Sequence, residues 1–318
     1  FKDHLENPRR IEELINKYTK INAATCQQSV MNDVSSLKLK KKIDYDYVII
    51  DEAARANPLD LLIPMSLGKR IILVGDHKQL PHLLEQSVVS SLLETKSSPE
   101  VKALLEEPLF SRLFNLLAQS ESTVQKRTVM LRDQYRMHPA IANFVSENFY
   151  DSELISGVSA EVKHPELQRY LEKPVAWIDI PRKFGDEYAS SSNSRSRKVE
   201  VTRVMEEIYG IFSENDHYTV GVITFYKKQA LEILQEVGKL SKTAQERIEV
   251  GTVDSFQGKE FDVVILSTVR SNNHKEKKSR VGFLDSKNRL NVAFSRGKRC
   301  LVVIGDANTV AAHEESIV

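Results

Sequence analysis

The sequence predicts an α/β protein with two parallel-sheet domains. Short apolar runs typical of buried strands alternate with amphipathic helical patterns, and this alternation occurs in two separate stretches of the chain. The length of 318 residues suits about two domains of roughly 150 residues each. We place the boundary at the polar stretch 119–126, so that residues 1–127 form the first domain and residues 128–318 the second.

The composition, with 41% hydrophobic and 28% charged residues, is ordinary for a soluble globular protein. No apolar run approaches the ~20 residues of a membrane span, and no signal-peptide pattern opens the chain. Cys26 and Cys300 have neither metal-ligand spacing nor a disulfide framework, which indicates an intracellular setting, cytoplasmic or nuclear. The net charge of +1 means that any basic track for nucleic acid must be local. The chain begins with Phe1 rather than Met, which suggests a fragment or a processed product.

In the first domain, apolar spacing predicts a helix over residues 5–20 and a short strand over residues 21–26. The lysines of the stretch 38–42 are interpreted as a solvated loop or helix end rather than a nucleic-acid contact. The continuous apolar run 47–50 predicts a buried strand. The next predicted elements are helix 59–67, strand 70–75 and helix 99–118.

The second domain is predicted to begin with a strand over residues 128–131, followed by a helix from Pro139 to about Phe149. The polar stretches 185–198 and 272–280 are predicted to be loops, the latter basic and flexible. The remaining predicted elements are strand 174–180, helix 198–213, strand 219–225, helix 226–240, strand 248–253, strand 262–269 and strand 299–304.

Two adjacent carboxylates, Asp51 and Glu52, stand at the carboxyl end of the first predicted buried strand. Ligands of parallel sheets bind at such ends. The pair could hold Mg²⁺, directly or through water, and polarise a hydrolytic water. The alternative is an acidic helix start that interacts with exposed N–H groups.

Three further residues stand beside predicted strand ends. The amide of Gln79 could bridge a terminal phosphate to a neighbouring carboxylate, or it could bond only to the backbone. Arg136 lies between a strand and a proline-started helix, where a guanidinium group can stabilise a transferring phosphoryl group. Tyr135 could stack on a base or be a core tyrosine.

The most specific stretch is a strand that enters a loop carrying Thr252, Ser255, Gly258 and Glu260, after which another strand leaves. Gly258 permits close backbone approach, and the hydroxyl groups could contact a sugar–phosphate backbone.

Further along the chain, Arg289 and Arg296 are seven residues apart, a spacing that predicts one helix face. A single arginine near a helix end is otherwise a surface charge or a partner of the helix dipole.

In their order these stretches resemble the motifs of superfamily 1 helicases, in particular the 5′→3′ branch that includes the nonsense-mediated-decay helicase. The correspondence covers nearly the whole chain: residues 47–54 resemble motif II, 74–81 motif III, 134–139 motif IV, 252–262 motif V and 288–298 motif VI. The resemblance implies two RecA-like domains, the first incomplete at its N-terminus. It also implies ATP and Mg²⁺ in the cleft between them and single-stranded DNA or RNA across both.

The resemblance implies a role for each candidate residue. Asp51 would hold Mg²⁺, Glu52 would be the general base and Gln79 the γ-phosphate sensor. Arg136 and Arg296 would be arginine fingers. The implied ATP contacts are Tyr135 on adenine, Glu260 on the ribose and Gly258, and the implied nucleic-acid contacts are Thr25, Gln27, Thr252 and Ser255.

One part of the family pattern is absent from the sequence, the P-loop Gly-x-x-x-x-Gly-Lys-Ser/Thr. Without it the chain has no backbone cradle for phosphates and no P-loop lysine. A minor departure is His82, where the family commonly has a second proline. We therefore expect the C-terminal portion of an ATP-dependent helicase, inactive by itself. The alternatives are a helicase-like nucleic-acid-binding module without ATPase activity, and a non-helicase ATPase with the same core.

Overall fold

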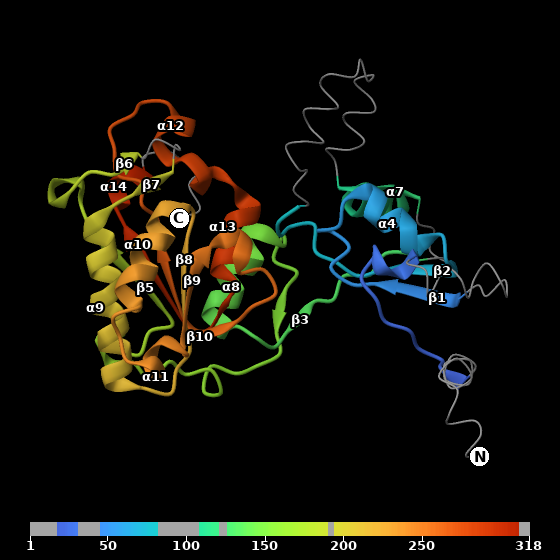
Figure 1. Cartoon of the computed structure of the whole chain (residues 1–318), viewed down its shortest axis with the longest axis horizontal. Helices are drawn as coiled ribbons and strands as arrows, with labels where there is room; N and C mark the ends of the chain where they lie inside the picture. Colours follow the sequence, from blue (N-terminus) through green and yellow to red (C-terminus); the bar gives the residue numbers. More distant parts are fainter. Residues whose placement is uncertain (1–17, 31–44, 82–107, 121–125, 190–193, 312–318) are drawn as a thin grey trace, which may run out of the picture. The chain divides into compact units, whose positions relative to one another are not determined.

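The computed structural model describes residues 18–30, 45–81, 108–120, 126–189 and 194–311. The chain divides into two compact units. The first contains the described residues up to Asp76 and those of 108–116, and the second contains His77–Pro81 and the described residues from Leu117 onward. Figure 1 shows their elements coloured along the sequence. Most of the predicted helix 5–20, the lysines of 38–42, His82 and residues 99–107 lie outside the described residues.

The first unit is built on two parallel strands, β1 (Tyr45–Ile50) and β2 (Gly68–Leu73), in which Tyr47 lies opposite Arg70. Helix α4 (Pro58–Met65) connects them and begins where Asn57 accepts the N–H groups of Leu59 and Asp60. A small core joins these elements to helix α7 (Leu109–Gln119); its buried members are Ile50, Ala53, Ala54, Leu61 and Phe110. Both predicted strands and the predicted helix between them are confirmed.

The strand predicted over residues 21–26 is wrong, because this stretch leads into a turn and the short 3₁₀ helix η1 (Gln28–Val30). The Thr25 hydroxyl accepts the N–H of Gln28 at 3.2 Å, and the Gln28 side chain accepts the N–H of Thr25 at 3.4 Å. Such local side-chain bonds compete with strand pairing and favour a turn.

The second unit contains a five-stranded, entirely parallel sheet in the order β5-β11-β10-β8-β9. Its strands are β5 (Val175–Asp179), β8 (Val220–Thr224), β9 (Ile248–Thr252), β10 (Phe261–Ser267) and β11 (Gly297–Gly305). All five were predicted from apolar runs, so the α/β class with a parallel sheet is confirmed.

Helices cover both faces of this sheet. Alternate residues of β10 point to opposite faces, so that Val263 and Ile265 belong to one core cluster and Val264 and Leu266 to another. The first cluster includes residues of α9 (Lys198–Glu214) and α10 (Lys227–Val237), and the second includes residues of α8 (Pro139–Phe149) and α13 (Lys287–Phe294). These helices were predicted, although α13 ends earlier than the spacing of the two arginines required.

The other elements of the second unit are short. They are β3 (Asp133–Gln134) with β4 (Ile155–Ser156), β6 (Tyr188–Ala189) with β7 (Arg195–Ser196), the helices α11 (Lys242–Gln245), α12 (Lys277–Val281) and α14 (Ala307–Val310), and the 3₁₀ helices η2 (Gln168–Tyr170), η3 (Arg182–Phe184), η4 (Val253–Ser255) and η5 (Gly282–Asp285). Within the described residues, no helix has the length and apolar character to cross a bilayer.

Four predictions for the second unit are wrong. Residues 185–198 are not wholly loop, because β6 pairs with β7 there and α9 begins at Lys198. Residues 128–131 are not a strand, and pairing is confined to Asp133–Gln134. Residues 272–280 are not wholly loop, because α12 begins at Lys277. Arg289 and Arg296 do not share a helix face, because α13 ends at Phe294 and β11 begins at Gly297.

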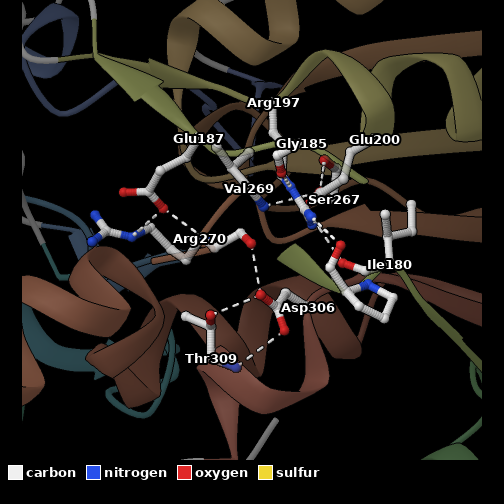
Figure 2. A network of polar contacts seen from close by, with 12 residues as sticks. Ile180, Gly185, Glu187, Arg197, Glu200, Ser267, Val269, Arg270, Asp306 and Thr309 are labelled. Atoms are coloured by element: carbon white, nitrogen blue, oxygen red, sulfur yellow. Dashed lines mark hydrogen bonds and ion pairs between the residues drawn. The ribbon is translucent and has the colours of Figure 1, made fainter. Parts of the chain in front are cut away.

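A buried polar network fills the carboxyl end of the sheet (Figure 2). Arg197 and Glu200 are both 0% exposed and lie 3.2 Å apart. Arg197 donates to the carbonyls of Ile180 and Gly185 at 2.9 and 2.8 Å. Glu200 accepts the Ser267 hydroxyl at 2.7 Å and the N–H of Val269 at 2.9 Å. Burial raises the pKa of Glu200.

The network continues from Val269 to helix α14. Val269 has a φ of 68°, which is rare for a β-branched residue and marks a strained backbone held by its surroundings. Beyond it, Arg270 lies 3.1 Å from Glu187, and Asp306 accepts the hydroxyl of Thr309 at 2.9 Å. At the ends of three strands, the network bonds to the Ile180 carbonyl after β5, to Ser267 of β10 and to Asp306 after β11. Open α/β sheets commonly bind ligands at this end of their strands.

Replacing Arg197 with alanine is expected to destabilise the protein by about 3–5 kcal/mol, because Glu200 would be left buried and unpaired. Urea unfolding measures the change. The matched control is Arg182→Ala, which removes an exposed pair with Asp186 and is expected to change the free energy of unfolding far less, because solvent screens exposed pairs. Equal losses in the two variants would contradict this account.

Candidate active site

The acid pair of the first unit lies in an exposed turn directly after β1. The N–H of Glu52 donates to the Asp51 carboxylate at 2.9 Å, and Glu52 has a φ of 52°. Helix α4 begins six residues later, at Pro58, so the pair does not form a helix start. A non-glycine residue with a strained backbone, such as Glu52, is often part of a functional site.

Gly75 packs against this turn. A Cβ at Gly75 would lie 2.8 Å from the backbone nitrogen of Ala54, so only glycine allows this approach. The ladder between β1 and β2 also extends to the turn, because Ala53 donates to Val74 at 2.9 Å. The turn that carries the two carboxylates is therefore fixed at the end of the two-stranded sheet.

In the second unit, the turn that carries Tyr135 and Arg136 is organised by Gln134. The Gln134 side chain accepts the N–H groups of Arg136 and Met137 at 3.0 and 2.7 Å, and donates to the Ser156 hydroxyl at 2.8 Å. His138 then caps α8 by accepting the N–H of Ala140 at its Nδ1. Burial, with a smaller effect of His164, lowers the pKa of His138 and favours this neutral form.

Arg136 and Glu260 face each other, with Arg136 Nε 2.9 Å from the Glu260 carboxylate. Arg136 also lies 3.4 Å from the carbonyl of Ser295. Both side chains of the pair remain partly exposed. A guanidinium group so placed can reach a bound anion without losing its partner.

Arg296 is 1% exposed and lies just beyond the end of α13. It donates to the Val292 carbonyl at 3.0 Å and the Ser295 hydroxyl at 2.7 Å, and its Nη2 lies 3.3 Å from the side-chain oxygen of Gln79. The structure therefore brings Gln79, Arg136, Glu260 and Arg296 together through Ser295. Arg296 is a buried residue rather than a surface charge.

Tyr135 is 65% exposed, which excludes a buried core tyrosine. Its ring lies against Gly157, where a Cβ would come within 2.3 Å of the ring. Gly157 in turn donates to the Gln134 carbonyl at 2.8 Å. An exposed ring supported on one side is suited to stacking.

The loop after β9 carries the remaining candidates of this unit. Thr252 ends β9, and the exposed Ser255 donates its hydroxyl to the Thr252 carbonyl at 2.8 Å. Gly258 has a φ of 81°, which favours glycine, and no atom lies within 4 Å of a Cβ built there. Glu260 then precedes β10.

The two candidates near the N-terminus, Thr25 and Gln27, lie in the first unit. Thr25 closes the turn before η1, and Gln27 lies 3.4 Å from Asp60. Both are exposed.

Taken separately, the acid pair of the first unit and the arginines of the second unit are residue types that bind Mg²⁺ and phosphate. In the part of the chain that the structure describes, no three His, Cys, Asp or Glu residues cluster as a metal site. Mg²⁺ does not require such a cluster, because it binds through one or two carboxylates together with water and substrate phosphates. The acid pair can supply the carboxylates, and Arg136 and Arg296 carry the charges that phosphates need.

Sequence reasoning missed Gln134, whose side chain organises the turn of Arg136. It also missed Asn288 and Asn291, which donate to backbone carbonyls of the segment that carries Gln79. A glutamine two residues before the candidate arginine was a usable signal. The two asparagines became visible only through their tertiary contacts.

Two family models match the chain. AAA_12, an AAA domain, matches residues 105–308, and AAA_11, also an AAA domain, matches residues 2–85. Several helicases are similar in sequence. The regulator of nonsense transcripts 1 homolog of Neurospora crassa is 33% identical over 283 residues, which is 86% of this chain and 24% of that protein. The ATP-dependent helicase NAM7 of Saccharomyces cerevisiae is 33% identical over 284 residues, 85% of this chain and 26% of that protein.

A third relative, the DNA polymerase alpha-associated DNA helicase A of Schizosaccharomyces pombe, is 32% identical over 324 residues, 95% of this chain and 44% of that protein. The chain thus spans less than half the length of these relatives. Among solved structures, the Arterivirus nonstructural protein 10 (helicase) with DNA has 16% identity over 81% of this chain and 39% of that chain, with a TM-score of 0.39.

The parallel α/β fold and the ordered motifs define a helicase-type protein of superfamily 1. The chain belongs to the AAA_12 family of AAA domains and to the branch of that superfamily that includes the nonsense-mediated-decay helicases.

Proposed function

We propose that this chain is the C-terminal portion of an ATP-dependent helicase or translocase that acts on single-stranded DNA or RNA. ATP would be hydrolysed between two RecA-like domains, residues 1–127 and 128–318. The observation that carries the proposal is the convergence of Gln79, Arg136, Glu260 and Arg296, which come from four separate parts of the sequence.

In the first domain, Asp51 would hold Mg²⁺ and Glu52 would accept a proton from the attacking water. Bound Mg²⁺ supplies charge neutralisation and polarises the phosphate. The exposure of both carboxylates and the strained φ of Glu52 support these roles.

Arg136 and Arg296 of the second domain would stabilise the charge that develops on the phosphoryl group. Gln79, from the segment His77–Pro81, would contact the terminal phosphate. Tyr135 would stack on adenine and Glu260 would bind the ribose, with Gly258 allowing close approach. The exposed ring of Tyr135 and the open space at Gly258 support this arrangement.

Single-stranded nucleic acid would contact Thr252 and Ser255 in the second domain, and Thr25 and Gln27 in the first. Hydroxyl groups at a strand end can bond to the phosphate backbone of either DNA or RNA. Two relatives are named for nonsense transcripts and for DNA, so both nucleic acids remain candidates.

A P-loop from outside residues 1–318 would complete the site, so that this chain alone would not hydrolyse ATP. The absence of a P-loop from the sequence also favours a second candidate function. In that case the chain would be a helicase-like nucleic-acid-binding module without ATPase activity of its own.

Binding of labelled oligonucleotides tests the nucleic-acid part of the proposal by fluorescence anisotropy. The chain is expected to bind single strands more tightly than duplexes. Thr252→Val combined with Ser255→Ala is expected to weaken binding by roughly thirtyfold, since two hydrogen bonds of about 1 kcal/mol each would be lost. Thr202→Val is the matched control, because it removes a hydroxyl group from helix α9. Wild-type affinity in the double variant would show that this loop does not contact nucleic acid.

A further inference from the structure

The segment His77–Pro81 follows β2 in the sequence but packs within the second unit. Leu80 is buried in the same core cluster as Leu290 and Phe294 of α13. The segment that carries Gln79 is therefore held by contacts remote from it in the sequence.

Two asparagines of α13 donate to three consecutive backbone carbonyls of this segment. Asn288 Nδ2 lies 3.2 Å from the His77 carbonyl and 2.6 Å from the Gln79 carbonyl. Asn291 Nδ2 lies 3.0 Å from the Lys78 carbonyl. Residues three apart lie on one face of a helix, so both asparagines contact the segment from a single face of α13.

Asn291 is also fixed by its surroundings. It is 0% exposed, and its Nδ2 lies 2.9 Å from the Tyr150 hydroxyl. Its Oδ1 has no hydrogen-bond partner among the described residues. A buried amide oxygen without a partner is costly. The two hydrogen bonds that Asn291 Nδ2 donates, to the Lys78 carbonyl and the Tyr150 hydroxyl, account for the orientation of this side chain.

We infer that Asn288 and Asn291 are positioning residues that hold Gln79 beside Arg296. Helix α13, whose asparagines hold the backbone of the segment, ends two residues before Arg296. The guanidinium group of Arg296 lies 3.3 Å from the side-chain oxygen of Gln79. The backbone and the side chain of Gln79 are thus held from one element. The catalytic meaning of this contact rests on the function proposed above.

The chemistry of the asparagine side chain suits this task. A neutral amide supplies two N–H donors and is less costly to bury than a charged donor. Aspartate has nearly the same shape but offers only acceptors when ionised, so it would repel the carbonyls. Asn→Asp is therefore the sharpest substitution available.

Hydrogen exchange tests whether the two asparagines hold the segment, and it requires no enzymatic activity. In the 318-residue chain, Asn288→Asp and Asn291→Asp are expected to speed exchange of the peptide 76–81 by on the order of tenfold, relative to a peptide from β10. The ratio cancels any general loss of stability. Asn148→Asp, which removes an exposed donor to Phe144 in α8, is the control and is expected to leave the ratio unchanged. An unchanged ratio in both α13 variants would show that the two asparagines do not hold this segment.

Double-mutant kinetics tests the positioning role in the protein extended to include a P-loop. Asn288→Asp is expected to lower kcat by roughly tenfold with little change in KM for ATP. If Asn288 acts through Gln79, then Asn288→Asp will cause no further loss in a Gln79→Ala background. A full tenfold loss in that background would overturn the positioning role and leave only a structural one.

The two experiments separate this inference from the proposed function. If the extended wild-type protein does not hydrolyse ATP, the proposed function fails. The exchange ratio still shows whether Asn288 and Asn291 hold the segment 76–81. If it hydrolyses ATP and Gln79→Ala is fully active, the positioning role is overturned.

Discussion

Replacing Glu52 with glutamine is expected to abolish ATP turnover in the intact protein while leaving ATP binding nearly unchanged. Glutamine has the shape of glutamate but cannot accept a proton, and loss of a general base typically lowers kcat by about 10²–10⁴-fold. Glu52 lies exposed in a turn whose backbone bonds, from Glu52 to Asp51 and from Arg55 to Glu52, do not involve its carboxylate. The turn itself is therefore expected to survive the substitution.

Single-turnover hydrolysis and equilibrium nucleotide binding separate these two effects. Glu206→Gln is the matched control, because Glu206 is an exposed glutamate of helix α9. Hydrolysis by Glu52→Gln at the parent rate would show that the general base is another group.

Arg296→Ala is expected to lower kcat of the intact protein by about 10³-fold or more, the usual effect of removing an arginine finger. The same substitution removes bonds to Val292 and Ser295 from a buried site, so the free energy of unfolding is expected to fall as well. A loss of rate larger than the loss of folded protein indicates the catalytic contribution.

Rate and urea unfolding are therefore measured on the same samples. Arg132→Ala is the control, because Arg132 forms an exposed pair with Glu153. Full activity of a folded Arg296→Ala variant would mean that Arg296 has only a structural role.

The three central strands of the second unit's sheet could be predicted from the sequence because they are largely buried on both faces. Such strands appear as continuous apolar runs, and β8, β10 and β11 each followed this pattern. The stretches 21–26 and 128–131 have similar apolar content, but no strand among the described residues pairs with them. Pairing is a tertiary property, and local composition does not reveal it.

The polar interior was not predictable in the same way. The stretch 185–198 was interpreted as a loop from its serines and charges, yet Arg197 is fully buried against the distant Ser267 and Val269 through Glu200. Likewise, the predicted common helix face of Arg289 and Arg296 failed because β11 begins sooner than the helical spacing allows. Motif order suggested the candidate residues, but their contacts depend on segments far apart in the sequence.

Steady-state ATP hydrolysis tests whether this chain needs a P-loop from outside residues 1–318. The measurement compares this 318-residue chain with the chain extended upstream to include a P-loop, each with and without single-stranded DNA or RNA. We expect hydrolysis by the extended protein alone, stimulated by single strands. Robust hydrolysis by the short chain would contradict this expectation, because the phosphates would then be held by residues other than those identified here, and an inactive extended protein would leave only the nucleic-acid-binding function.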